Sequence, residues 1–169
     1  MEQGFKSLPP FSNWRDLRDH YLHAADVVVT ECALYHQLLG ERCGMERLHT
    51  LYLARDPGAF CPEPALPEGR ISLCYLGSIN NIIDIPRIQE IIRTMGAPVE
   101  LHIIGDGEQR QALIDGASEA GALVSYHGKV YDPAQKRRIL DRCHFGLNIM
   151  KDSVFVGLTM KSMDYFEYG

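Results

Sequence analysis

The sequence contains no apolar run long enough to cross a membrane and no strong excess of charge of either sign. A membrane-spanning helix needs about 20 consecutive apolar residues, so none is expected. We find no secretory signal in the first residues and expect a cytoplasmic protein. The net charge of −5 argues against a broad electrostatic grip on nucleic acid or on an anionic membrane. This net charge is compatible with a local basic site for a phosphorylated small molecule.

Several motifs that would indicate a particular reaction or ligand are also missing. The chain has no G-K-[ST] phosphate loop, no G-x-G-x-x-G fingerprint, no G-x-S-x-G elbow and no H-E-x-x-H motif. Its five cysteines are odd in number and widely spaced, which predicts reduced thiols rather than a disulfide framework. We expect no metal site, and the scattered histidines leave the catalytic residues unassigned.

The composition that is present is that of a globular protein, with 46% apolar and 23% charged residues among 169. Residues 56–69 hold four prolines and two glycines, which is typical of an exposed connection. We place a linker at 56–70, between a first part at 1–55 and a second part at 71–169. The first part is predicted to contain helices at 14–25 and 32–39, the latter stopped by Gly40, and strands at 26–30 and 48–53.

The second part alternates apolar strands with helices. The predicted strands are 71–76, 99–104, 123–126 and 145–150. The predicted helices run from Asp84 or Pro86 to about 95, and over 108–120, 133–143 and 159–168. Strands that alternate with helices of about 10–15 residues form βαβ units. We therefore predict an α/β fold, a Rossmann-like parallel sheet with helices on both faces.

Ligands of such sheets bind beyond the carboxyl ends of the strands, so the turns there form the candidate site. Gly77 and Ser78 follow the first strand of the second part, and Lys129 and Val130 follow the third. Glycine lets the backbone approach a ligand closely, and serine can form hydrogen bonds with it. The alternatives are an ordinary turn for Gly77 and Ser78, and a solvated surface position for Lys129.

Two neighbouring positions are also ambiguous. Asp106, between Gly105 and Gly107, is most simply a turn or cap residue ahead of a helix. His127 is the histidine placed closest to the ligand edge, and its alternative is an ordinary core or surface position.

The closing segment joins a strand, a glycine-containing turn and a helix, an arrangement that presents backbone N–H groups to a phosphate. Lys161 and Asp164 are three residues apart and share one face of that helix. A lysine there can meet a diphosphate as a point charge, and a carboxylate one turn later can accept hydrogen bonds from ribose. The alternative is a surface ion pair between the two, worth about 0.3–0.5 kcal/mol. At the end of this helix, Gly169 is predicted to form the C-cap.

Four segments together carry a family resemblance: YLGS at 75–78, LHIIGDG at 101–107, VSYHGKV at 124–130 and GLTMKSMDY at 157–165. They resemble the C-terminal, nucleotide-sugar-binding half of a GT-B glycosyltransferase of the retaining family 4 type. The last segment is similar to the K-x-x-E-Y variant of that family's acidic motif. The resemblance covers residues 71–169, and residues 14–55 look like the end of the N-terminal domain and the crossover.

The resemblance implies contacts with the diphosphate and the base. Gly77 and Ser78 would approach the donor diphosphate, and Lys129 and Val130 would flank the nucleotide base. Three further positions would lie near the phosphates: Gly157, Leu158 and Thr159.

The sugar side of the site also follows from the resemblance. Lys161 would neutralise phosphate charge and Asp164 would hold the ribose, while Asp152 and Ser153 would face the transferred sugar. Such enzymes use a nucleotide sugar as substrate and need neither a metal nor another cofactor. The helix dipole and basic side chains stabilise the leaving diphosphate.

The sequence departs from the family pattern at three points. Ser78 and the Asn80–Asn81 region stand where the family usually carries Arg and Lys. Asp164 stands where Glu is typical, and Asp152 is the nearest counterpart of the first acidic residue. The family's N-terminal domain, with its acceptor pocket and catalytic histidine, is also mostly unmatched in this sequence. For these reasons we expect the chain alone to bind a donor weakly, if at all, and not to transfer sugar.

The implied setting is polysaccharide or glycoconjugate synthesis, including cell wall biosynthesis. The partners are a sugar or lipid-linked acceptor and, by peripheral association, the inner face of the membrane. A non-catalytic nucleotide-binding or interaction module of Rossmann-like fold is the alternative function. An unrelated Rossmann-like domain, such as an epimerase or a receiver, is a third. The oligomeric state is not predicted.

Overall fold

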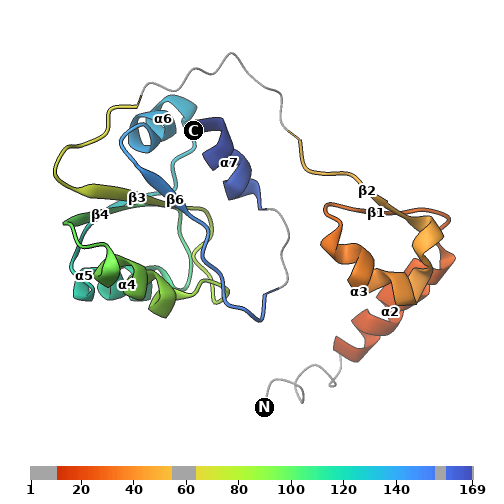
Figure 1. Cartoon of the computed structure of the whole chain (residues 1–169). Helices are drawn as coiled ribbons and strands as arrows, with labels where there is room; N and C mark the ends of the chain where they lie inside the picture. The colour runs from red at the N-terminus through yellow and green to blue at the C-terminus, as the bar shows by residue number, and fades with distance from the viewer. Residues whose placement is uncertain (1–10, 55–63, 155–158, 169) are drawn as a thin grey trace. The chain divides into compact units, whose positions relative to one another are not determined.

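The structure is a computed structural model of the chain, and it describes residues 11–54, 64–154 and 159–168. These residues form two compact units, one ending at Ala54 and the other following it (Figure 1). Each unit is treated by itself below. Of the predicted linker at 56–70, the described part belongs to the second unit, because the Ala65 N–H donates to the Asp141 carbonyl at 2.7 Å.

The first unit is a small α/β layer. Its elements are α2 (Phe11–Ala24), β1 (Val28–Thr30), α3 (Leu34–Cys43), the 3-10 turn η1 (Met45–Arg47) and β2 (Leu48–Thr50). Strands β1 and β2 are parallel, with Val28 opposite Leu48. Nη1 of Arg42 on α3 lies 2.8 and 3.0 Å from the two carboxylate oxygens of Asp19 on α2, so an ion pair joins the two helices.

The predicted end of the second helix at Gly40 is wrong. The helix α3 continues through Gly40 to Cys43 and ends at Gly44, whose φ of +83° lies in the region that favours glycine. The Gly44 N–H donates to the Gly40 carbonyl at 3.0 Å and closes the last turn. Both glycines follow apolar residues, so the sequence pattern does not show which of them ends the helix.

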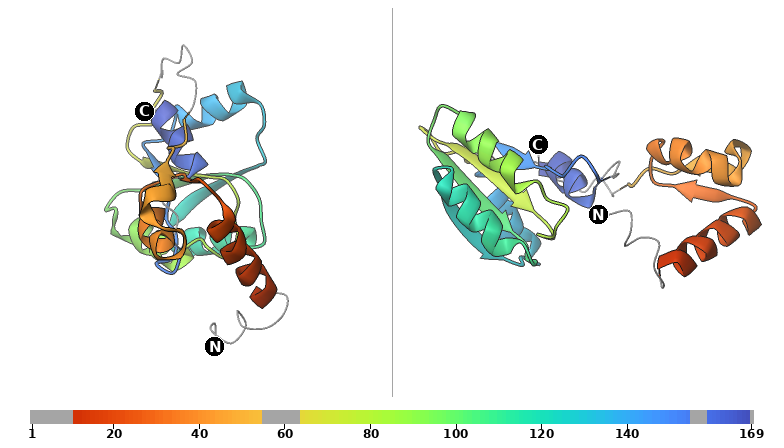
Figure 2. Two further views of the ribbon diagram at one scale, coloured as in Figure 1. Left: turned by 90° about the vertical axis from the view of Figure 1, so that its right-hand side faces the viewer. Right: turned by 90° about the horizontal axis from the view of Figure 1, so that it is seen from below.

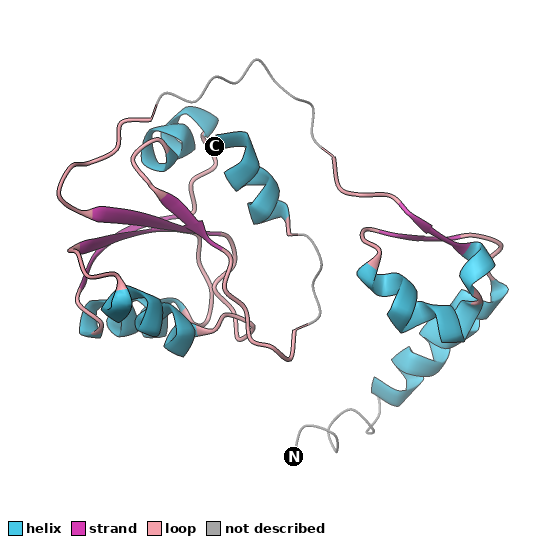
Figure 3. Cartoon of the chain, in the orientation of Figure 1, coloured by secondary structure: helices cyan, strands magenta, loops and turns pink. Residues whose placement is uncertain are grey.

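The second unit confirms the predicted Rossmann-like parallel sheet (Figure 3). Its elements in order are β3 (Ile71–Leu76), α4 (Ile85–Thr94), β4 (Val99–Ile104), α5 (Arg110–Glu119), β5 (Ala122–Gly128), α6 (Pro133–Leu140), β6 (Phe145–Leu147) and α7 (Met160–Tyr168). The strand order is β5-β4-β3-β6, and all pairs are parallel. Helices α4 and α5 cover one face, and α6 and α7 lie on the other (Figure 1, Figure 2).

Alternate residues of β3 and β4 build the two sides of the core. Leu73 and Leu101 are fully buried against α4 and α5, within the larger apolar cluster. Cys74, Leu76 and Ile104 face α6 and form a smaller cluster with Ile139 and Leu140. The second face also carries buried polar groups, Ser72, Glu100 and His102. Both faces of the sheet are therefore covered, as a parallel sheet requires.

The predicted strand at 145–150 is shorter in the structure and ends at Leu147. Beyond it the chain leaves the sheet and pairs with the loop that follows β3. The Lys151 N–H donates to the Ile82 carbonyl at 2.9 Å, and Met150 forms an antiparallel bridge with Ile83. The apolar run alone could not show this change of partner, because a strand and a paired loop bury the same kinds of side chain.

A single tyrosine fastens α7 to the sheet. The Tyr165 hydroxyl accepts the Leu76 N–H at 3.0 Å and lies 3.1 Å from the Cys74 carbonyl and 3.2 Å from the Leu147 carbonyl. These groups belong to β3 and β6, so one hydroxyl joins two strands and a helix. The ring lies against Gly146, where a Cβ would overlap it. Burial raises the pKa of Tyr165, so the hydroxyl stays protonated.

We expect the Tyr165→Phe variant to lose about 1–3 kcal/mol of unfolding free energy, because the Leu76 N–H is left without its acceptor. The measurement is urea unfolding followed by far-UV circular dichroism, together with amide exchange of the β3 segment. Tyr131→Phe is the control, since that side chain is 83% exposed. Equal stability of the two variants would contradict the role given to the Tyr165 hydroxyl.

Candidate functional site

A cavity of about 260 Å³ opens at the carboxyl ends of three neighbouring strands. It is lined by residues 76–78 after β3, 104–106 after β4 and 129–131 after β5. Gly77, Ser78, Lys129 and Val130 were predicted as site residues from sequence, and the structure brings all four together around this cavity. Tyr131, which the sequence argument did not single out, also lines it.

Glycine allows the turns around this cavity to pack closely. Gly105 has φ +141°, and a Cβ there would overlap the Gly77 carbonyl oxygen. The Gly77 N–H donates to the Ile104 carbonyl at 2.8 Å, and the Gly105 N–H donates to the Gly128 carbonyl at 2.7 Å. Three successive strand ends are thus bonded to one another, and the backbone lies at the surface of the cavity where no side chain intervenes.

Asp106 has the turn role that its position suggested. Its Oδ1 accepts the Gly107 N–H at 2.9 Å and lies 3.4 Å from the Arg110 guanidinium. The carboxylate is therefore engaged with its own loop and with the start of α5.

Lys161 of α7 reaches the edge of the sheet beside this cavity. Its Nζ donates to the Tyr75 hydroxyl at 3.2 Å and lies 4.3 Å from the centre of that ring, a cation–π distance. Its Cε lies 3.6 Å from where a Cβ on Gly77 would stand. Within the described ranges, no carboxylate forms an ion pair with Lys161, and burial lowers the pKa of its ammonium group.

Tyr75 connects Lys161 to the loop after β3. The Tyr75 hydroxyl donates to the Ser78 carbonyl at 2.7 Å while it accepts from Lys161. Burial raises the pKa of Tyr75 to about 12, so the hydroxyl stays a donor at neutral pH. Tyr75 belongs to the YLGS segment that carries the family resemblance, but the apolar pattern of the strand did not assign it a role.

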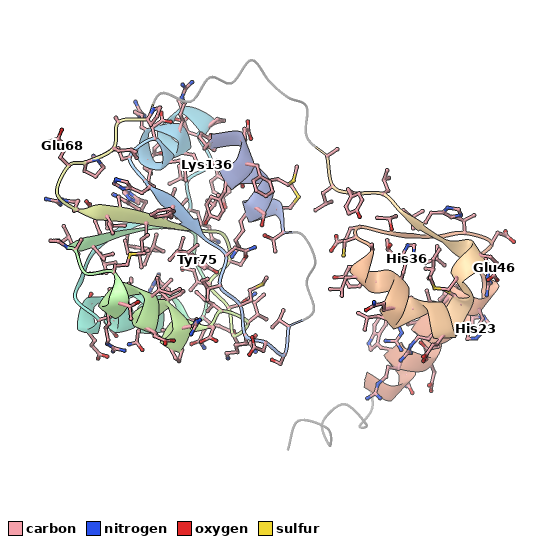
Figure 4. The ribbon with its side chains drawn as sticks, in the orientation of Figure 1. His23, His36, Glu46, Glu68, Tyr75 and Lys136 are labelled. Atoms are coloured by element: carbon pink, nitrogen blue, oxygen red, sulfur yellow. The ribbon has the colours of Figure 1, made fainter. Side chains whose placement is uncertain are left out.

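The sequence suggested an ion pair between Asp164 and Lys161 on the same helix. In the structure Asp164 forms an ion pair with Lys136 of α6. Its Oδ1 lies 3.3 Å from Nζ of Lys136 on α6, and both side chains are largely buried (Figure 4). The basic run of Lys136, Arg137 and Arg138 on α6 is therefore not wholly exposed to solvent. Asp164 does not belong to the lining of the 260 Å³ cavity.

Thr159 immediately precedes α7, and its side chain accepts a hydrogen bond from the first turn of that helix. Its Oγ1 accepts the Ser162 N–H at 3.3 Å and the Asn148 amide at 3.1 Å, and the same amide donates to the Ser162 hydroxyl at 2.9 Å. The start of α7 is therefore tied to the end of β6.

The predicted site residues Gly157 and Leu158 and the predicted C-cap Gly169 lie outside the described residues.

Asp152 lines a different cavity, of about 600 Å³, together with Asp84, Arg87 and residues 148–150. Asp84 is the N-cap of α4 and accepts the Arg87 N–H at 3.0 Å. The predicted site residues that line cavities are therefore divided between two of them, and Thr159, Lys161 and Asp164 line neither. One contains the strand-end glycines and Lys129, and the other contains Asp152.

A buried polar group lies behind the first cavity on the α6 face of the sheet. The His102 Nδ1 and His127 Nε2 atoms are 3.0 Å apart, and the rings are stacked. Glu100 lies 3.4 Å from His102 and accepts a hydrogen bond from Ser125 at 3.2 Å. Burial lowers the pKa of both histidines, and the Glu100 charge opposes that shift. His127 is thus part of a packed polar group rather than an isolated side chain at the edge.

No group of three or more His, Cys, Asp or Glu side chains in the part that the structure describes is placed to hold a metal ion. None of the helices in those ranges is long and apolar enough to cross a membrane.

Comparison with known proteins identifies the fold. No protein-family model and no curated protein matches this sequence. A solved structure of the lipopolysaccharide outer core galactosyltransferase WaaB, in its apo form, is similar over 85% of this chain, with a TM-score of 0.67 and 17% identity. The fold is the Rossmann-like half of a GT-B structure. This chain spans 41% of the length of the WaaB chain.

A second solved structure, the catalytic domain of cholesterol-alpha-glucosyltransferase from Helicobacter pylori, is similar over 51% of this chain and 54% of its own. The identity is 14% and the TM-score 0.42.

The histidine pair predicts a pH dependence of stability. The folded pKa of His102 lies below its unfolded value near 6.5, so the unfolded chain binds more protons in that range. The stabilisation is therefore present above about pH 6.5 and is lost as the pH falls through the folded pKa. Glu100, His127 and Arg142 face the same ring and contribute to the shift.

We expect the unfolding free energy of the second unit to fall between pH 7.5 and pH 5.5, and His102→Gln to flatten this dependence. Amide exchange of the β4 segment at each pH measures it. His20→Gln, at an exposed position of the first unit, is the control. An unchanged slope in His102→Gln would refute this assignment.

Proposed function

We propose that the second unit binds the diphosphate of a nucleotide-sugar donor, as part of a retaining glycosyltransferase of family 4 type. The observation that carries this proposal is the position of Lys161. A half-buried cation without a carboxylate partner among the described residues is unfavourable for the fold, and it stands beside a cavity at the ligand edge of a parallel sheet. A bound anion would offset that cost.

The cations available at the cavity support a small anionic ligand. The loop after β3 offers Ser78, Asn80 and Asn81 and carries no Arg or Lys. Lys129 lines the cavity and Lys161 stands beside Gly77. These two lysines would supply the charge that the family usually places in the loop, with the base between Lys129 and Val130 and the diphosphate toward Gly77.

The proposed chemistry is electrostatic. In sugar transfer the bond between the anomeric carbon and the diphosphate oxygen breaks, and negative charge develops on the leaving diphosphate. Lys161 would stabilise that charge, and the start of α7 would add its helix dipole. Tyr75 positions Lys161 because it accepts the ammonium hydrogen bond and is itself fixed by the Ser78 carbonyl.

The proposal includes a contact between the Asp164 carboxylate and the ribose of the donor. Lys136 holds Oδ1 of this carboxylate at 3.3 Å, so a ribose contact would have to be made by a carboxylate that is already fixed in place. Asp152, at the other cavity, would face the transferred sugar.

The acceptor and the setting of the reaction belong to the whole enzyme, and this chain spans 41% of the length of the WaaB chain. A sugar or lipid-linked acceptor, glycoconjugate or cell wall synthesis, and a cytoplasmic site at the membrane face are parts of the proposal for the whole enzyme. A non-catalytic nucleotide-binding module would share the donor site and lack transfer.

The test is ligand-observed NMR of the full chain against UDP, GDP, ADP and CMP, compared with the Lys161→Met variant. Loss of a charge-assisted contact of about 1.5–3 kcal/mol predicts a Kd weaker by roughly 10- to 150-fold. The variant should keep or raise the unfolding free energy, because it removes a half-buried charge. This combination separates a binding residue from a structural one.

Lys151→Met is the matched control, since Lys151 is exposed. It should leave both the affinity and the stability unchanged. Full affinity in Lys161→Met, or no binding of any nucleoside diphosphate by the folded chain, would overturn the proposed donor site.

A further inference from the structure

Two thiols meet at a third cavity, on the α6 and α7 side of the sheet. Cys74 of β3 and Cys143, which follows α6, both line a space of about 70 Å³ beside Tyr165 and Gly146. Neither cysteine is in a disulfide. This cavity is distinct from the two described above, and neither thiol contributes to them.

The contacts make the two thiols unequal. Cys74 is fully buried, whereas Cys143 is partly exposed. The Cys143 Sγ lies 3.2 Å from the Ile139 carbonyl and 4.0 Å from the Ser72 hydroxyl, and Cys143 packs against the apolar cluster that contains Cys74. The interaction with Cys74, with help from Ser72 and Arg142, lowers the pKa of Cys143, while the pKa of Cys74 is raised.

This difference between the two thiols is typical of a reactive pair, in which one cysteine attacks the oxidant and the other resolves the product. The thiolate is the nucleophilic form of cysteine, so the thiol with the lowered pKa and the better access is the attacking one. The second thiol lies at the same cavity, so it can resolve the oxidised product once it passes its proton to the departing hydroxide.

We propose that Cys143 and Cys74 form a peroxide-reactive pair that converts reversibly to a disulfide. The Cys143 thiolate attacks one oxygen of hydrogen peroxide, the O–O bond breaks, and a sulfenic acid and hydroxide form. The Cys74 sulfur then attacks the Cys143 sulfur, the S–O bond breaks and water leaves. In sum, two thiols and one peroxide give one disulfide and two waters.

The size of the cavity selects the oxidant. A water molecule in the liquid occupies about 30 Å³, so a space of about 70 Å³ has room for hydrogen peroxide. It has no room for glutathione disulfide, which consists of two tripeptides joined by a disulfide. The pair should therefore respond to hydrogen peroxide and resist large disulfide reagents in the folded chain.

The modification would act on the attachment of α7. Tyr165 lines the same cavity, and its hydroxyl is 3.1 Å from the Cys74 carbonyl. A bond between Cys74 and Cys143 would shift the backbone that this hydroxyl holds. We expect faster amide exchange in α7 and at Leu76 after oxidation.

The experiment treats the full chain with hydrogen peroxide, blocks the remaining thiols and maps the peptides by mass spectrometry. The expected product is a Cys74–Cys143 peptide pair, lighter by two hydrogens and restored by dithiothreitol. In Cys143→Ser, the oxidation of Cys74 should be lost. In Cys74→Ser, a sulfenic acid on Cys143 should accumulate and be trapped by dimedone.

Cys43→Ser is the matched control, because the Cys43 thiol is also buried and makes the same contact with the carbonyl four residues earlier, Leu39, at 3.3 Å. It should leave the Cys74–Cys143 product unchanged. Circular dichroism of each variant establishes that it is folded, with Cys143→Ala as a second variant. Oxidation of Cys143 no faster than that of Cys43, or a product formed only in denaturant, would overturn the proposal.

Discussion

The close approach of the turns after β3 and β4 is the constraint on which the rest of the site depends. Because Gly105 has no Cβ, the Gly77 carbonyl can lie against it, and the two strand ends bond to each other and to Gly128. This contact exposes backbone at the cavity and brings Gly77 within reach of Lys161. A larger residue at 105 would separate the turns, and the strand ends would no longer form one concave surface.

Helix α7 adds the second half of the arrangement. It packs on the smaller apolar cluster through Tyr165 and Tyr168 and is also held by polar contacts. Tyr165 spans β3 and β6, Asn148 joins β6 to the first turn, and Lys136 holds Asp164. Together these contacts orient the helix so that Lys161 faces Tyr75. The fold thereby keeps a half-buried lysine near an open cavity, a conflict between local stability and position that is common at binding sites.

Much of the fold could be predicted from the sequence. The predicted bounds of strands 71–76 and 99–104 agree with the observed ones, because both are mainly apolar segments between turn residues. The end of α3 at Gly44 and the end of β6 at Leu147 were not predicted. In both cases the sequence offers two equivalent signals, and the choice depends on which backbone group finds a partner.

The sequence by itself determined the parallel α/β sheet and the set of turns that could hold a ligand, since strand and helix periodicity follow from local side-chain patterns. Only the tertiary structure decided which of those turns share a cavity. It placed Asp152 at a different cavity, gave Asp164 a partner on α6, selected Tyr75 as the support of Lys161, and brought Cys74 next to Cys143. These contacts join residues tens of positions apart, and side-chain periodicity carries no information about such distances.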